Sequence, residues 1–312
     1  MSEPKGLRLL VGYSPDDRGE DALALAALVA RTAKAAVTVA NVHPPAWPAR
    51  GPASVDAEWV AYLREQSQAA VARAAARLAE LKVPERNVTL VVHTHRGSGR
   101  GLLEVAGQAG ADLIVAGSAP RGRRGRIAIG STADQLLHGS PVPVLLAPRG
   151  YAEEAPQRFE RLTVAYWRRR DVEVPLTAAT GLAASLGLPV RLLTLVLRPA
   201  GLTGKFRGAE EVVRRQCAQA ERDLEHAAGL VGPGLEVETE IAVGSGTAKT
   251  LGGVGLLPGE VLACMSSHDG PLRKVFLGES SGKIVRAAGC PVLVLPRGPR
   301  GPGPDRDRAD RS

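Results

Sequence analysis

The sequence has 312 residues, a formal net charge of +8, three cysteines and few aromatic residues. This length accommodates two domains with separate cores, and no apolar run reaches the ~20 residues that span a bilayer. The cysteines lie in the second half without C-x-x-C spacing, which excludes a disulfide or zinc framework and indicates a reduced, cytoplasmic protein. The first residues lead directly into a strand, so no signal peptide is expected.

Short apolar runs alternate with helical patterns throughout the first 150 residues. This alternation predicts an α/β fold with a doubly wound, five-stranded parallel sheet, which binds ligands at the carboxyl ends of its strands. Strands are expected over 7–13, 37–42, 87–92, 112–116 and 143–147, and helices over 18–34, 55–81, 97–109 and 130–137.

A second copy of this pattern follows a polar stretch. A shift of 148 residues places Gly130 on Gly278, and an internal repeat of domain length indicates two copies of one fold. We predict a first domain over 1–150, a linker over 151–160, a second domain over 161–297 and a disordered tail over 298–312. The second copy is expected to have strands over 162–167, 190–197, 235–243, 261–265 and 292–295, and helices over 171–186, 210–228, 246–254 and 280–288.

The last strand of each copy, 143–147 and 291–295, is apolar on both faces. Each would be an exposed sheet edge if it were left alone, and proteins avoid such edges. We therefore expect these two strands to pair with each other inside one chain, so that the two copies form an internal pseudo-dimer.

The most informative stretch lies between residues 112 and 150. A buried strand ends at a glycine, a loop with four arginines follows, and a short helix begins after a second glycine. Such a loop holds anions through backbone N–H groups and the helix dipole, and hydroxyl and guanidinium groups add donors. A hydroxyl side chain is also expected to cap the helix. The candidate phosphate-binding residues are Gly117, Ser118, Arg124, Gly130, Ser131 and Thr132.

The spacing from Gly117 through position 120 to Gly130-Ser131 resembles the signature G-x2-G-x9-G-[ST] of the universal stress protein family. Residues 136–144 also resemble the last helix and strand of that family. In the family this loop wraps the phosphates and ribose of ATP. The resemblance therefore implies an adenine nucleotide alpha hydrolase-like fold, a stress-response regulator and an ATP site in the first copy, with Mg²⁺ accompanying the nucleotide.

Four positions bear on the implied nucleotide site. Pro120 stands where the signature has glycine, and it lacks an N–H for phosphate. Ser14 stands where the family has an Asp that contacts adenosine, so it can accept a hydrogen bond without carrying a charge. Asp16 either substitutes for that acid or only caps the next helix, and the cap is favoured. Val42 matches the residue that packs against adenine, although it could equally be a core valine.

The second copy departs further from the signature. Met265 or Ser266 stands at the position of Gly117, and Trp167 at the position of Ser14. Glu279 replaces Ser131, and its carboxylate would repel phosphate although it suits the helix dipole. The second copy is therefore expected to bind no nucleotide and to serve as a structural partner.

Other functions are less favoured. His43, His93 and His95 lack ligand spacing, so no structural metal is expected, and no nucleophile motif indicates an enzyme. Aromatic stacking platforms are missing, which argues against a nucleic-acid partner despite the positive charge. Two alternatives stay open: a scaffold of the same fold that binds no nucleotide, and a slow ATPase, for which the sequence offers no clear residue to position water. The protein partner and any further homodimer also stay open.

Overall fold

A computed structural model describes residues 6–45, 54–168, 172–198, 207–266 and 278–296. The tail predicted over 298–312 lies outside these residues. Within them, ten strands form one continuous sheet in the order β3-β2-β1-β4-β5-β10-β9-β6-β7-β8. The strands are β1 (Arg8–Gly12), β2 (Ala36–His43), β3 (Val88–Thr94), β4 (Leu113–Gly117), β5 (Val144–Ala147), β6 (Arg161–Ala165), β7 (Val190–Leu197), β8 (Val237–Gly244), β9 (Glu260–Met265) and β10 (Val292–Leu295).

The sheet consists of two halves with the same strand order. The N-terminal half contains β1–β5 and the C-terminal half β6–β10, and all neighbours within a half are parallel. In each half the chain first moves outward to one edge and then returns past the first strand to the other side. This is the doubly wound arrangement that the alternating apolar runs predict.

The two halves join through β5 and β10, which pair antiparallel. Leu145 lies opposite Leu293, and these two residues are equivalent in the repeat. The local two-fold axis of the pseudo-dimer therefore passes through this pair. The prediction that these apolar strands cover each other's edges is confirmed.

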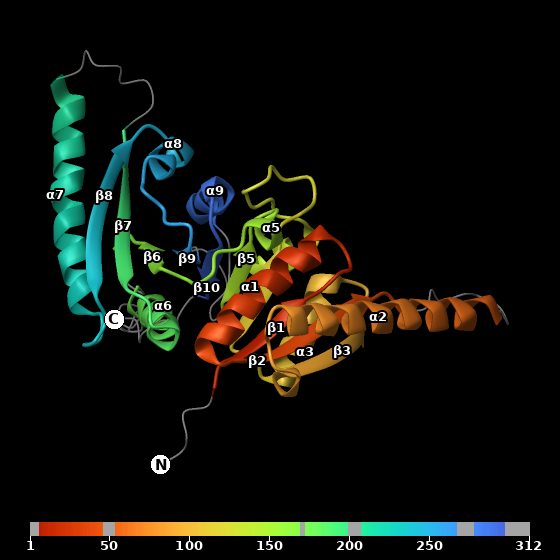
Figure 1. The fold of residues 1–312 in the computed structure, drawn as a ribbon. Coiled ribbons are helices and arrows are strands. Elements are labelled where there is room, and N and C mark those ends of the chain that lie inside the picture. The colour runs from red at the N-terminus through yellow and green to blue at the C-terminus, as the bar shows by residue number, and fades with distance from the viewer. Residues whose placement is uncertain (1–5, 46–53, 169–171, 199–206, 267–277, 297–312) are drawn as a thin grey trace, which may run out of the picture.

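Helices cover both faces of the sheet (Figure 1). Along β1, Leu9 packs in the core under α1 and Leu10 in the core on the opposite face, as the alternation of side chains in a strand requires. The helices are α1 (Asp17–Ala33), α2 (Ser54–Glu80), α3 (Ser98–Ala109), α4 (Ser131–Leu137), α5 (Tyr151–Glu154), α6 (Glu173–Leu186), α7 (Arg207–Gly229), α8 (Thr247–Gly252) and α9 (Glu279–Ala287), and a short 3-10 turn spans Glu85–Asn87. No described helix is both long and apolar enough to cross a membrane.

Helix α2 is longer than the sheet that it covers. Its 27 residues span about 40 Å, whereas the seven residues of β3 span about 23 Å. Val71 and Leu78 are buried, while Trp59 and Tyr62 near the start of the helix are about half exposed. The first turns of α2 therefore extend beyond the strands (Figure 1).

The stretch predicted as a polar linker is fastened to the N-terminal half. It contains the short helix α5, and Tyr151 and Phe159 in it are buried. The buried carboxylate of Asp21 on α1 accepts hydrogen bonds from the N–H groups of Gly150 and Ala152, at 2.9 and 2.8 Å. Burial raises the pKa of Asp21, and these two bonds offset only part of that rise.

Candidate functional site

A cavity of about 320 Å³ opens at the carboxyl ends of β1, β2 and β4. This is the position where a doubly wound sheet binds its ligands, since the strand order reverses there. We call it the N-terminal cavity. Its walls comprise Gly12, Tyr13, Ser14, Arg18, Ala40, Asn41, Val42, Ser98, Leu102, Ala116, Gly117, Ser131, Thr132 and Ala133.

Five of the eight residues predicted from the sequence line this cavity. They are Ser14, Val42, Gly117, Ser131 and Thr132. Ser118, Arg124 and Gly130 are not among the described residues that line it. The sequence argument did not select Arg18, Asn41 or Ser98, although each of them follows or ends a strand at the same edge of the sheet.

Ser14 and Asp16 form the turn between β1 and α1. The Ser14 hydroxyl donates to Asp16 Oδ1 at 2.8 Å, and the same carboxylate accepts the N–H groups of Arg18 and Gly19 as the N-cap of α1. The Arg18 guanidinium also donates to Asp16 Oδ2 at 2.6 Å. Burial raises the pKa of Asp16, but these hydrogen bonds lower it by more, so the net shift is downward. Asp16 is therefore the cap, as the sequence favoured.

The apolar wall of the cavity comes from β2 and α3. Val42 is partly buried and packs with the core that includes Leu102 and Ala40. The Asn41 amide donates to the carbonyl of Tyr13 at 2.8 Å, which fixes the end of β2 to the end of β1. This apolar wall and the polar turn of Ser14 line the same cavity.

Gly117 ends β4 close to the backbone of α1. A Cβ atom at this position would lie 2.1 Å from the carbonyl oxygen of Arg18. Glycine is therefore required by the packing of α1 against β4, whether or not a ligand is bound. The sequence argument named this glycine only as a candidate phosphate-binding residue.

The N-terminus of α4 differs from the predicted hydroxyl cap. Gly130 is the N-cap residue and makes no side-chain cap bond, while Ser131 is the first helical residue and is exposed. The Thr132 hydroxyl lies 2.9 Å from the Ser98 hydroxyl at the start of α3. The expectation of a Ser or Thr cap is wrong, and these hydroxyls instead face the N-terminal cavity, where they can donate to a ligand.

The loop between β4 and α4, residues 118–130, is called the arginine loop. Hydrogen bonds between its two ends stabilise it. The N–H of Ala119 donates to the carbonyl of Ala128, and the N–H of Ala128 donates to the buried hydroxyl of Ser118, both at 2.8 Å. Ser118 therefore closes the base of the loop. Pro120, the departure from the signature, is exposed at the start of the loop.

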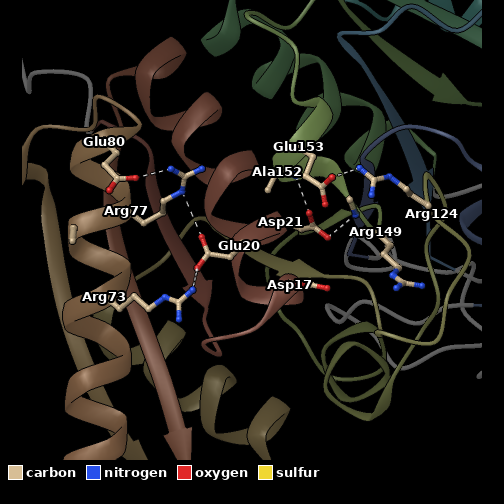
Figure 2. Close-up of a pocket in the computed structure, with 12 residues that line it drawn as sticks. Asp17, Glu20, Asp21, Arg73, Arg77, Glu80, Arg124, Arg149, Ala152 and Glu153 are labelled. Atoms are coloured by element: carbon tan, nitrogen blue, oxygen red, sulfur yellow. Dashed lines mark hydrogen bonds and ion pairs between the residues drawn. The ribbon is translucent and has the colours of Figure 1, made fainter.

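Arg124 lies away from the N-terminal cavity. Its guanidinium pairs with Glu153 and Glu154 of α5 and lines a separate cleft of about 630 Å³. Figure 2 shows this cleft between α1, α2 and α5, with Arg73 and Arg77 facing Glu20 on its other side. Both signs of charge line the cleft, so it does not form a concentrated anion site.

A second loop arginine reaches the C-terminal half. Arg126 donates to the carbonyl of Ala287 at the end of α9, and its guanidinium approaches Gly289. A cation at a helix C-terminus is favoured by the helix dipole. The arginine loop thus contacts both α5 and α9 instead of folding over the N-terminal cavity.

The equivalent positions of the C-terminal half carry different side chains. Because Ile114 and Leu262 pair with Val144 and Val292 respectively, Met265 is the equivalent of Gly117 and Ser266 the equivalent of Ser118. The same comparison of β1 with β6 places Trp167 at the position of Ser14. These residues, together with Glu279 at the position of Ser131, replace small and hydroxyl groups by bulk and negative charge.

The histidines are engaged in local contacts. His93 Nε2 lies 2.7 Å from Glu104 Oε2, and His95 Nε2 lies 3.6 Å from the other oxygen of that carboxylate. Among the described residues no group of three or more His, Cys, Asp or Glu side chains could hold a metal ion.

Comparison with known proteins identifies the relatives of this chain. The model of the universal stress protein family matches twice, over residues 7–148 and 159–296. Universal stress proteins of Mycobacterium tuberculosis and Mycobacterium bovis are both 37% identical over 293 residues, which is 93% of this chain and the full length of each relative.

A solved structure supports the same fold assignment. The crystal structure of a universal stress protein from Archaeoglobus fulgidus matches with a TM-score of 0.58 at 16% identity. The match covers 93% of this chain and 96% of that protein. At this identity the likeness concerns the fold alone, including the tandem arrangement of two α/β halves.

Proposed function

Since the chain belongs to the universal stress protein family, we propose that its N-terminal half binds ATP or a related adenine nucleotide and that the bound nucleotide controls its part in a stress response. The proposal places this regulator in the cytoplasm. It does not include a catalytic step.

The N-terminal cavity is the observation that carries this proposal. It combines an apolar wall at Val42 and Leu102 with the hydroxyls of Ser98, Ser131 and Thr132. An adenine ring would pack on the apolar wall, and the hydroxyls would donate to ribose or phosphate oxygens. Its volume of about 320 Å³ is at the lower end of the range for small-molecule sites.

Arg18 is the cation nearest to this arrangement. It lines the cavity, but its guanidinium is held by Asp16. An incoming phosphate would compete with Asp16 for Arg18, so part of the attraction would be lost to the existing ion pair. The carboxylate of Asp16 would remain satisfied by the N–H groups of Arg18 and Gly19.

Magnesium fits the site only as a companion of the nucleotide. No described cluster of acidic or histidine side chains could hold the ion, so the phosphates themselves would supply its ligands, with hydroxyls such as Ser131 or Thr132 close by. Mg²⁺ prefers this mode because it retains several waters and binds phosphate oxygens. When bound, the ion would neutralise phosphate charge.

A scaffold that binds no nucleotide is the second candidate. The specific observation in its favour is the arginine loop, whose side chains contact α5 and α9 and leave few cations at the cavity. In that case the N-terminal cavity would be a remnant of the fold, and the protein would act through its surface.

Calorimetric titration of the full chain with MgATP tests the proposal, together with mass spectrometry of any nucleotide released on denaturation. We expect one site per chain. Ser131→Ala should weaken binding by about 1.5–3 kcal/mol, the range for a hydrogen bond to a charged group, and should leave stability unchanged because Ser131 is not the cap. Ser185→Ala, a change of an exposed hydroxyl on α6, is the matched control.

Three results would argue against nucleotide binding in this site. Absence of both copurified nucleotide and titration heat would favour the scaffold. Two equivalent sites per chain would contradict the asymmetry between the halves. Equal affinity of Ser131→Ala and the control would place any nucleotide elsewhere.

A further inference from the structure

The C-terminal half has its own cavity at the position of the N-terminal one. Its volume is about 260 Å³. Its walls are largely apolar, with Trp167, Leu195 and Ile284 among them, and the hydroxyls of Thr247 and Ser280 at its rim. We call it the apolar cavity. Trp167 stands where Ser14 begins the polar turn of the N-terminal half, so the chemistry of the site has changed from polar to apolar.

A second hollow adjoins the apolar cavity. It has a volume of about 590 Å³ and shares Leu197 and Thr247 with it. Lys249 of α8 and Lys283 and Arg286 of α9 line this hollow, and no carboxylate does so among the described residues. We call it the cationic hollow. Figure 1 shows that the two helices that supply these cations lie next to each other.

The cations of the hollow are largely uncompensated. Lys283 pairs with Glu279 at 2.6 Å on the exposed surface of α9. Neither Lys249 nor Arg286 has an ion-pair partner in the described part of the chain. A guanidinium and an ammonium group that form no ion pair attract an anion, and Arg can bind a carboxylate or phosphate through two parallel hydrogen bonds.

The residues at the equivalent helix contact differ between the two halves. A Cβ atom on Gly99 of α3 would lie 2.6 Å from Cβ of Gln135 on α4, so those two helices pack closely. The equivalent residues in the C-terminal half are Ala248 and Lys283. Ala248 and Lys283 both line the cationic hollow, so the residues that replace this glycine and glutamine form part of its wall.

From this juxtaposition we propose that the C-terminal half binds a small amphipathic acid. Its apolar tail would occupy the apolar cavity, and its carboxylate or phosphate head would bind Lys249, Lys283 and Arg286 in the cationic hollow. A nucleotide is disfavoured, since Glu279 and Met265 replace the small phosphate-facing residues of the other half. The apolar cavity is smaller than typical drug-sized sites, which suits a single chain or ring.

Calorimetric titration of the full chain with decanoate, below its micellar concentration, tests this proposal. Affinity should rise about fourfold for each methylene added from hexanoate to decanoate while the cavity has room, as about 0.8 kcal/mol per buried methylene implies. 1-Decanol should bind much more weakly than decanoate. Binding should also change the tryptophan fluorescence, and Trp167→Phe should abolish that change.

Substitutions of charged residues at the cationic hollow distinguish the contribution of the head group to binding from that of the tail. Arg286→Ala should lower the affinity for decanoate by roughly 10- to 150-fold, which corresponds to the loss of a hydrogen bond to a charged group. Arg286→Lys should restore part of this affinity. Glu279→Gln frees Lys283 and should tighten binding about two- to fivefold, as expected for an exposed ion pair. Arg214→Ala on α7, which covers the opposite face of the sheet, is the control and should bind as the original chain does.

The proposal is overturned by any of three results. The first is an affinity that does not depend on chain length, which would leave a general anion site. The second is equal binding of decanol and decanoate. The third is decanoate binding that survives Arg286→Ala unchanged.

Discussion

The two halves of the protein share strand order and register but differ at both edges of the sheet. At the carboxyl edge the N-terminal half has glycine and hydroxyl groups, whereas the C-terminal half has Trp167, Met265 and Glu279. At the amino edge the N-terminal half has one exposed ion pair, Arg8–Asp112, and the C-terminal half has a buried ionic network. The shared backbone therefore does not dictate the chemistry of either edge, and each half has been adapted separately.

The buried network is centred on Glu260, the equivalent of Asp112. Its side chain is fully buried and accepts hydrogen bonds from Arg161 at 3.0 Å, from Arg191 at 2.5 Å, from the Thr163 hydroxyl and from the N–H of Leu257. In the N-terminal half the equivalents of Thr163 and Arg191 are Leu10 and Thr38, so no such network can form. The C-terminal half thus depends on a charge that the N-terminal half does not need.

The largest expected effect comes from removing this charge. Glu260→Gln removes the buried carboxylate that Arg161 and Arg191 share. Each arginine then keeps only a more exposed partner, Glu238 or Glu240, and the free energy of unfolding should fall by about 3–5 kcal/mol. The control is Asp112→Asn, which breaks the equivalent exposed pair and should cost about 0–1 kcal/mol. Urea denaturation of both variants measures the difference. Equal losses would mean that the two pairs have the same role despite their different burial.

The stabilisation by ionised Glu260 should also make the free energy of unfolding depend on pH. Burial raises the pKa of Glu260, but the hydrogen bonds from Arg161, Thr163 and Leu257 and the charge of Arg191 lower it by more. Because the folded-state pKa lies below the unfolded value of about 4.3, the stabilisation is present above that pH and is lost as the pH falls through the folded-state pKa.

Denaturation curves between about pH 6 and pH 3.5, a range that spans the ordinary pKa of Glu, measure this loss. The original chain should lose stability more steeply than Glu260→Gln as the pH falls. Asp21 acts in the opposite direction, since its raised pKa means that its ionisation disfavours the folded state as the pH rises. Parallel curves for the two proteins would show that Glu260 does not titrate with a lowered pKa.

A smaller effect is expected where α1 meets β4. Gly117→Ala places a methyl group against the carbonyl of Arg18 and should destabilise the protein by about 1–3 kcal/mol, the usual cost of overpacking. Gly181→Ala is the control, because a Cβ there meets no atom within 4 Å and alanine favours the helix α6 by about 1 kcal/mol. If Gly117→Ala is neutral in the absence of nucleotide, the glycine is not required by packing.

The C-terminal half has the fully buried Met265 at the same position, and the first strand of this half is followed by a longer connection. Helix α1 begins at Asp17, four residues after Tyr13, whereas α6 begins at Glu173, seven residues after Tyr166. Relative to the two equivalent tyrosines, the helix after the first strand therefore begins three residues later in the C-terminal half.

The fold was largely predictable because its signals are local and repeated. Apolar runs marked the strands, and the shift that places Gly130 on Gly278 marked the repeat. The pairing of β5 with β10 followed from two strands with no polar face. The short helix α5 was missed because four residues in a polar stretch carry no period, and its attachment depends on Asp21, more than a hundred residues earlier in the chain.

The candidate site was less predictable because a charged side chain can pair with residues that are near it only in the folded chain. Sequence places Arg124 in a phosphate-binding loop, yet its guanidinium pairs with Glu153 and Glu154, which only the folded chain brings near. A hydroxyl after Gly130 suggested a cap, but the loop enters the helix one residue earlier. The candidates at or just after strand ends line the cavity, as do Ser131 and Thr132 at the start of α4, whereas the candidates within the loop do not.

The smallest expected effect compares two equivalent tyrosines. The Tyr13 hydroxyl donates to Glu20 Oε1 at 3.0 Å, and burial, followed by this hydrogen bond, raises the pKa of Tyr13 to about 12. The buried hydroxyl of Tyr166 has no hydrogen-bond partner within the described residues. Tyr13→Phe should therefore lower the free energy of unfolding by about 1 kcal/mol. Tyr166→Phe should be neutral or slightly stabilising, because it removes a polar group that burial leaves unsatisfied.

Urea denaturation of the two single variants and of the double variant measures both changes in the free energy of unfolding. The changes should add in the double variant, since the two sites lie in different halves. A clear loss in Tyr166→Phe would indicate that this hydroxyl has a partner, and the two halves would then be alike at this position.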